Sequence, residues 1–173
     1  GAMAKSCLFL MLRRPPRSTL FPYPTLFRSL PWTINRMRLV MGKQWTLPAM
    51  VVEGKQTTRT LLWLSDQSWS EHSETIKQLL QAKYRIICFD PVFIGHANPE
   101  GSLYQNTELV STVGSRPLGV QVAQIQAATR YFADLYQLKQ LDLKTTGMRV
   151  GIAALCAKAS DSPSRIEIGR AHV

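Results

Sequence analysis

The strongest constraint on the fold is a change in the spacing of apolar residues along the chain. Residues 36–41 and 44–52 predict two strands joined by a turn at 42–43. Residues 59–64 predict a third strand that is apolar enough to be buried on both faces. From residue 71 onward, segments with helical and strand-like spacing alternate. An antiparallel start followed by strand–helix–strand–helix–strand–helix indicates an α/β fold with a parallel sheet, flanking helices and right-handed crossovers.

The alternating part contains five predicted segments after the third strand. They are a helix over 71–83, a strand over 84–90, a long helix over 117–138, a strand over 141–146 and a helix over 150–159. Ser70 is expected to cap the first of these helices. The long helix is expected to bury one face, formed by Leu118, Val122, Ile125, Phe132 and Leu135. Between the 84–90 strand and the long helix, glycines and prolines predict a loop of about two dozen residues.

The composition indicates a single domain without a specific nucleic-acid surface. The chain has 173 residues, 45% of them hydrophobic, which suffices for one ordinary core. The net charge is +10, but residues 1–29 hold five basic residues and no acidic one. Residues 30–162 carry fourteen Lys/Arg and ten Asp/Glu, scattered without a basic stripe or an aromatic platform. A solvated surface explains this charge better than a nucleic-acid partner.

The sequence indicates neither a membrane span nor a metal or cofactor site. No apolar stretch approaches the ~20 residues that cross a bilayer. Cys7, Cys88 and Cys156 are odd in number and outside any zinc-ligand or disulfide spacing, so idle thiols in a reducing compartment are expected. No phosphate loop or dinucleotide fingerprint is present. We therefore expect a soluble, cytoplasmic protein with no cofactor.

The two ends of the chain do not resemble evolved protein sequence. Residues 1–3 are similar to the scar left after removal of an expression tag. Residues 8–29 resemble the conceptual translation of a sequencing adapter, and residues 166–173 resemble a second one. The organisation expected from this is a tag scar and adapter-like arm over 1–29, a truncated domain over 30–162 and an adapter-like tail over 163–173. Such a chain is a fragment assembled from environmental sequence data.

A family resemblance accompanies this order of elements. Three segments carry it: TLPAMVVEGKQTTRTLLWLSD (46–66), IICFDPVFIGH (86–96) and SRPLGVQVAQIQAATRYF (115–132). Over roughly residues 36–160 the chain resembles α/β-hydrolase-like proteins of the acetyl-xylan-esterase-like type. The resemblance implies the first five strands of an α/β-hydrolase-like sheet, an incomplete version of that fold.

The resemblance also implies where a nucleophile would lie. In such folds it occupies a sharp turn, G-x-S-x-G, between the fifth strand and its helix. The matching residues are Gly147, Arg149 and Gly151, with Arg149 at the nucleophile position. A guanidinium stays protonated and cannot attack a carbonyl. The carboxylate and imidazole side chains that follow this turn are Asp161, Glu167 and His172. No catalytic triad can be assembled from them.

Other candidate residues are weaker. Ser65 and Asp66 follow the third strand, where hydrolases often place an oxyanion-hole loop, but the segment is interpreted first as helix-capping. Asp90 ends a parallel-type strand, where ligands gather, and is interpreted as a turn-forming residue because a proline follows it.

The histidines and the last cysteine are interpreted as structural residues. His72 and His96 have no partner at ligand spacing and are expected at the surface. Cys156 lies mid-helix among alanines, where a buried thiol is inert.

Two functional hypotheses follow. The first is a non-catalytic hydrolase-like fragment that forms homo-oligomers through an exposed sheet edge at the fifth strand and through apolar surface. The second is a carboxylic ester hydrolase with a rearranged or intersubunit site that uses Ser65, Asp66 or His96, for which a small-molecule ester is the substrate.

Overall fold

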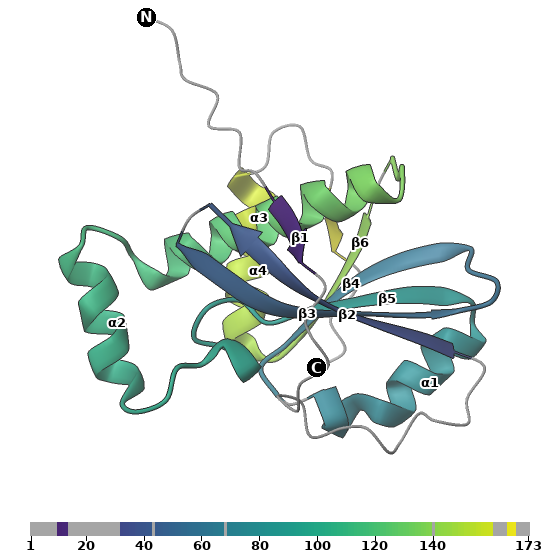
Figure 1. The fold of residues 1–173 in the computed structure, drawn as a ribbon, viewed down its shortest axis with the longest axis horizontal. Helices are drawn as coiled ribbons and strands as arrows, with labels where there is room; N and C mark the ends of the chain where they lie inside the picture. Colours follow the sequence, from purple (N-terminus) through teal and green to yellow (C-terminus); the bar gives the residue numbers. More distant parts are fainter. Residues whose placement is uncertain are drawn as a thin grey trace, which may run out of the picture.

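The computed structural model describes residues 10–13, 32–42, 44–67, 69–139, 141–160 and 166–168. The strands in these residues form one mixed sheet of seven strands, in the order β1-β2-β3-β5-β4-β6-β7 (Figure 1). The strands are β1 (Leu10–Arg13), β2 (Trp32–Met41), β3 (Trp45–Gly54), β4 (Arg59–Ser65), β5 (Tyr84–Phe89), β6 (Leu141–Thr146) and β7 (Ile166–Ile168). The helices are η1 (Trp69–His72), α1 (Ser73–Gln81), η2 (Gly95–Ala97), α2 (Leu103–Thr112), α3 (Pro117–Leu135) and α4 (Met148–Ser160). The predicted α/β architecture is confirmed.

The predicted hairpin is present and longer than the sequence indicated. β2 and β3 pair antiparallel from Trp32 opposite Gly54 to Met41 opposite Trp45. Gly42 in the turn has a φ of +63°, a conformation that glycine adopts without steric cost. β3 then pairs antiparallel with β5, which joins the hairpin to the parallel part of the sheet.

β4 is the central strand of the parallel part. It pairs parallel with β5 on one side and with β6 on the other. Every residue of β4 after Arg59 is buried, which confirms the prediction that both faces of this strand are covered. α1 packs on one face, against Trp63, Ile86 and Cys88. α3 and α4 cover the opposite face (Figure 1).

The predicted loop between β5 and α3 contains two helices, so that prediction was wrong. η2 and α2 lie within it. No residue of α2 is buried, and the helix stands away from the sheet in Figure 1. Because α2 contributes nothing to the core, it lacks the periodic apolar face by which a helix is recognised in a sequence.

Two details of the predicted helices also differ. The 71–83 segment divides into η1 and α1, and the residue at the N-cap position of α1 is His72 rather than Ser70. In α3 the residues Leu118 and Leu135 are exposed. The buried face instead includes Gln121 and Gln124.

These two glutamines hold the chain after β5. The Gln121 side-chain amide donates to the Val92 carbonyl over 2.9 Å, and the Val92 amide donates to Gln124 Oε1 over 2.9 Å. These two bonds satisfy the backbone amide and carbonyl of Val92, which is buried and lies outside any strand. They explain why two glutamines belong to the buried face of α3 beside Ile125 and Phe132.

The sheet edges lie in the two segments that resemble adapter sequence. Leu10–Arg13 pairs with β2, and Ile166–Ile168 pairs parallel with β6 at Leu141–Leu143. The fifth strand predicted from the sequence corresponds to β6. It was expected to be an unpaired edge strand, but its first half pairs with β7. Residues 1–9, 14–31, 161–165 and 169–173 lie outside the described residues. Within the described ranges, no helix has both the length and the apolar character needed to cross a membrane.

Candidate functional site

Polar side chains gather where the parallel strands end. β4, β5 and β6 run parallel, so their carboxyl ends lie together at the same end of the sheet. Ser65 and Asp66 lie at the end of β4, Asp90 follows β5, and Gly147 follows β6. This end of the sheet is where α/β proteins bind ligands, and it contains all the candidate residues from the sequence.

Asp66 closes the N-terminus of α4. Its Oδ2 accepts from the Arg149 amide over 2.9 Å, and its Oδ1 accepts from the Val150 amide over 3.0 Å. The Asp66 amide in turn donates to the Thr146 carbonyl over 2.9 Å. The first amides of a helix have no partner inside it, and the helix dipole favours an anion there. Asp66 was expected to cap the helix that follows β4, but that helix has no side-chain cap, and Asp66 instead caps α4, which begins 82 residues further along the chain.

Gly147 is required by this cap. It has a φ of +111°, and a Cβ built on it would overlap the Asp66 carboxylate. The glycine thus lets the carboxylate approach the helix end. It also supplies a turn that β-carbon-bearing residues adopt only with strain.

Arg149 has a structural place in this arrangement. It lies in the first turn of α4, and its φ is not positive, unlike those of the described residues Lys83, Phe93 and Gln137. Arg149 Nη2 donates to the Phe93 carbonyl over 3.0 Å. Phe93 is buried with a φ of +65°, so the guanidinium braces a strained turn after β5. The residue at the predicted nucleophile position is therefore part of the scaffold.

Ser65 forms a hydrogen bond with His72. Ser65 Oγ lies 2.7 Å from His72 Nε2 and accepts from the Gln67 amide over 3.0 Å. Burial lowers the pKa of His72, which favours the neutral ring that accepts a hydroxyl proton. However, Ser65 is 0% exposed, and no described carboxylate is bonded to the His72 ring. The pair has the contact of a serine–histidine dyad without access for a substrate or a carboxylate that orients the imidazole.

The expectation that His72 is a surface residue without a partner was wrong. Its ring is half-buried and lies 5.1 Å, centroid to centroid, from the Trp63 ring. Trp69 packs edge-on to Trp63 at 5.7 Å. This aromatic cluster fixes η1 against the end of β4, and no periodic pattern of residues indicated it.

Asp90 and His96 form a second pair. Asp90 is 2% exposed and accepts at Oδ2 from the His96 amide over 2.8 Å and from His96 Nδ1 over 3.1 Å. Its Oδ1 accepts from Trp69 Nε1 over 3.0 Å. The hydrogen bond to Asp90 raises the pKa of His96. His96 is at the surface as predicted, but it has a partner, and Asp90 is a buried anion enclosed by N–H donors.

The two histidines respond to acid in opposite ways. The pKa of His96 is higher in the folded protein than in the unfolded chain. Its pairing with Asp90 therefore contributes its full stabilisation at pH values below the unfolded-state pKa, and this contribution is lost as the pH rises through the folded-state pKa. The lowered pKa of His72 means that its stabilising contact is present above the unfolded pKa and is lost as pH falls through the folded value.

The candidate residues therefore fall into three separate groups. Ser65 bonds to His72, Asp66 to the start of α4, and His96 to Asp90. Burial raises the pKa of the Cys88 thiol well above its ordinary value, so this thiol is not a nucleophile. Among the described residues, no three His, Cys, Asp or Glu side chains converge as metal ligands do.

Similarity to solved structures identifies the fold. The sequence matches no protein-family model and no curated protein. An acetyl xylan esterase from Paenibacillus sp. R4 superposes with a TM-score of 0.60 at 13% identity, covering 91% of this chain and 51% of that structure. An esterase from Pyrococcus furiosus gives 0.56 at 15%, covering 87% and 54%. A dienelactone hydrolase from Anabaena variabilis gives 0.55 at 16%, covering 80% and 62%. The chain has an α/β-hydrolase-like fold that spans between half and two thirds of each of these structures.

Gly147→Ala tests the cap at α4. We expect the free energy of unfolding to fall by about 2–3 kcal/mol, because strain at positive φ is added to loss of the Asp66 cap. Urea unfolding of the purified protein measures this. Gly101→Ala is the matched control, since Gly101 has a φ of +94° and no atom within 4 Å of a built Cβ. Equal costs for the two substitutions would contradict the role of Asp66.

Proposed function

We propose that this chain, which has an α/β-hydrolase-like fold, is a non-catalytic module that associates with a second copy of itself. The esterase and hydrolase activities named for its structural neighbours belong to those proteins. In this chain the proposal rests on one observation above all: the Asp66 carboxylate accepts from both amides at the start of α4.

That contact removes the electrostatic part of ester hydrolysis. An acyl-transfer site needs N–H groups directed at the oxygen on which negative charge develops. Here the amides of Arg149 and Val150 are occupied by a carboxylate of the same chain. An oxyanion at this position would meet a negative charge, and a guanidinium stands where the nucleophile would be. Both effects act against catalysis.

A second candidate function is ester hydrolysis at Ser65. The 2.7 Å contact between Ser65 Oγ and His72 Nε2 favours it, as does the neutral ring implied by the lowered pKa of His72. The complete burial of Ser65 argues against it, because η1 would have to move before an ester reached the hydroxyl. We therefore interpret the pair as a clasp between β4 and η1.

Hydrolysis of p-nitrophenyl acetate distinguishes these functions. We expect the unmodified protein to hydrolyse this ester no faster than the His96→Gln variant does. That variant lacks the exposed imidazole, so it controls for non-specific hydrolysis by the His96 ring. Ser65→Ala and His72→Gln should leave the rate unchanged. Arg149→Ser should restore little activity, because Asp66 still fills the amides. Turnover that is lost in both Ser65→Ala and His72→Gln would establish the esterase and exclude the non-catalytic module.

Self-association is proposed to involve the exposed face of α4. Met148, Ile152 and Leu155 are spaced at i, i+4 and i+7 and are 79%, 47% and 61% exposed. The opposite face of the helix, with Val150 and Ala154, is buried. A contiguous apolar stripe of this kind marks an interface. Two copies related by a twofold axis would bury the same stripe against itself.

Leu155→Glu tests this interface. We expect the unmodified protein to sediment as a dimer or larger species at micromolar concentration, and the variant to sediment as a monomer, because a carboxylate would be buried without a partner. Leu109→Glu is the control, since Leu109 is equally exposed but lies on α2. A monomeric unmodified protein, or dissociation by Leu109→Glu alone, would refute the proposed interface.

A further inference from the structure

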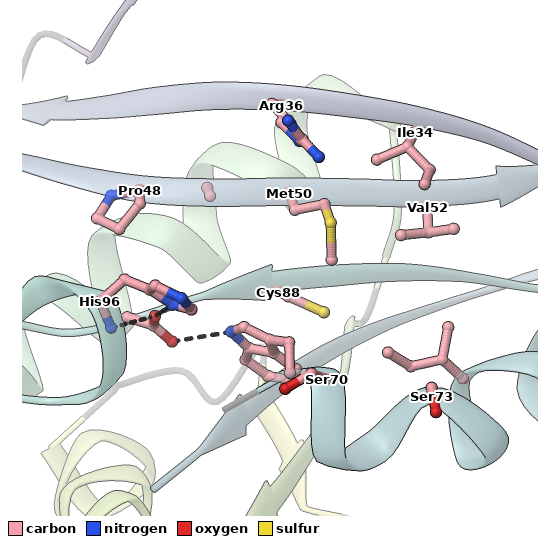
Figure 2. A pocket seen from close by; sticks show the side chains of 13 residues that line it. Ile34, Arg36, Pro48, Met50, Val52, Ser70, Ser73, Cys88 and His96 are labelled. Atoms are coloured by element: carbon pink, nitrogen blue, oxygen red, sulfur yellow. Dashed lines mark hydrogen bonds and ion pairs between the residues drawn. The ribbon is translucent and has the colours of Figure 1, made fainter. Parts of the chain in front are cut away.

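A pocket lies between the hairpin and the segment formed by η1 and α1. It has a volume of about 80 Å³ and is open on one side. Figure 2 shows Ile34, Met50 and Val52 of the hairpin on one side of it and Ser70 and Ser73 on the other. Since one water needs about 10–15 Å³ by the same measure, the pocket has room for a chain of several carbon atoms.

The interior of the pocket is apolar because the strands present their side chains toward α1. Met50 and Val52 alternate along β3, and Ile76 of α1 faces them. Small side chains at Ser70 and Ser73 leave the space unfilled. A dry apolar pocket of this kind retains an apolar ligand better than it retains water.

The accessible charged group at the pocket is the basic side chain of Arg36. Asp90 is the acidic residue of the lining, and its carboxylate is covered by N–H donors from Trp69 and His96. Gly95 allows this enclosure, because a Cβ on it would lie 2.6 Å from Asp90 Cγ. Arg36, opposite Met50 in the hairpin register, brings a guanidinium to the rim. His96 adds a second cationic group when protonated.

We propose that this pocket binds a small aliphatic carboxylic acid, with its alkyl chain between Met50, Val52 and Ile76 and its carboxylate at Arg36. A guanidinium matches a carboxylate in geometry and charge. The Asp90 carboxylate would attract a cationic head group, but N–H donors from Trp69 and His96 already bind it, so the preference for an anion comes from Arg36 at the rim. The site lies on the face of the sheet that α1 covers, away from Gly147 and Arg149, and requires no hydrolysis.

Calorimetric titration with octanoate, octanol and octylamine tests this proposal on the full chain. The three probes share an alkyl chain and differ in head-group charge. We expect octanoate to bind about tenfold more tightly than octylamine.

Two variants assign the binding to this pocket. Arg36→Gln should abolish the preference for octanoate, whereas Arg38→Gln, on the same strand and the same side of it but outside the lining, should keep it. Ser73→Leu should fill the space and abolish binding of all three probes, with circular dichroism confirming the fold. The proposal is overturned if octanoate and octylamine bind equally, if Arg38→Gln acts as Arg36→Gln does, if a folded Ser73→Leu still binds, or if no binding occurs up to about 10 mM octanoate.

Discussion

The contact between Asp66 and the start of α4 is the interaction on which the carboxyl edge of the sheet depends. Asp66 follows the central strand, and the amides it holds belong to the helix that follows β6. The contact thus ties β4, β6 and α4 together at one point. The contact requires a glycine at 147, because a β-carbon there would overlap the Asp66 carboxylate. The strength of such a contact comes from two charge-assisted hydrogen bonds in a partly buried place. Its consequence is that the amides best suited to stabilise an oxyanion are already occupied.

Asp90 repeats the same design one strand away. It ends β5, is enclosed by N–H donors and lies against a glycine that could not carry a side chain. Arg149 completes the set by bracing the Phe93 turn that follows Asp90. The charged groups at the edge where α/β enzymes carry out chemistry are therefore paired with one another or with the backbone. In this α/β-hydrolase-like scaffold these polar residues hold loops and a helix end in place.

The sequence predicted the parts of the fold that depend on local apolar patterns. The hairpin, the doubly buried β4 and the helix after β6 each follow from spacing within a few residues. The helix α2 was missed because it buries nothing. The buried Ile125 and Phe132 of α3 were predicted, but Gln121 and Gln124 were not, because Val92 of a distant loop satisfies them. At the site, the sequence indicated a capping role for Asp66 but not the helix that it caps. It could not pair Ser65 with His72 or Arg149 with Phe93, because these contacts join segments whose approach is set by the assembled sheet.

Hydrogen exchange of the Arg149 and Val150 amides tests the central claim most directly. Amides in the first turn of a helix lack intrahelical partners and exchange quickly when only water solvates them. If the Asp66 carboxylate binds both, they will exchange slowly in the native protein, at rates resolved by NMR. In Asp66→Ala they will exchange faster by about an order of magnitude, while amides in the middle of α4 remain protected. Fast exchange of both amides in the unmodified protein, or the same rates in Asp66→Ala, would contradict the claim that this carboxylate occupies the helix end.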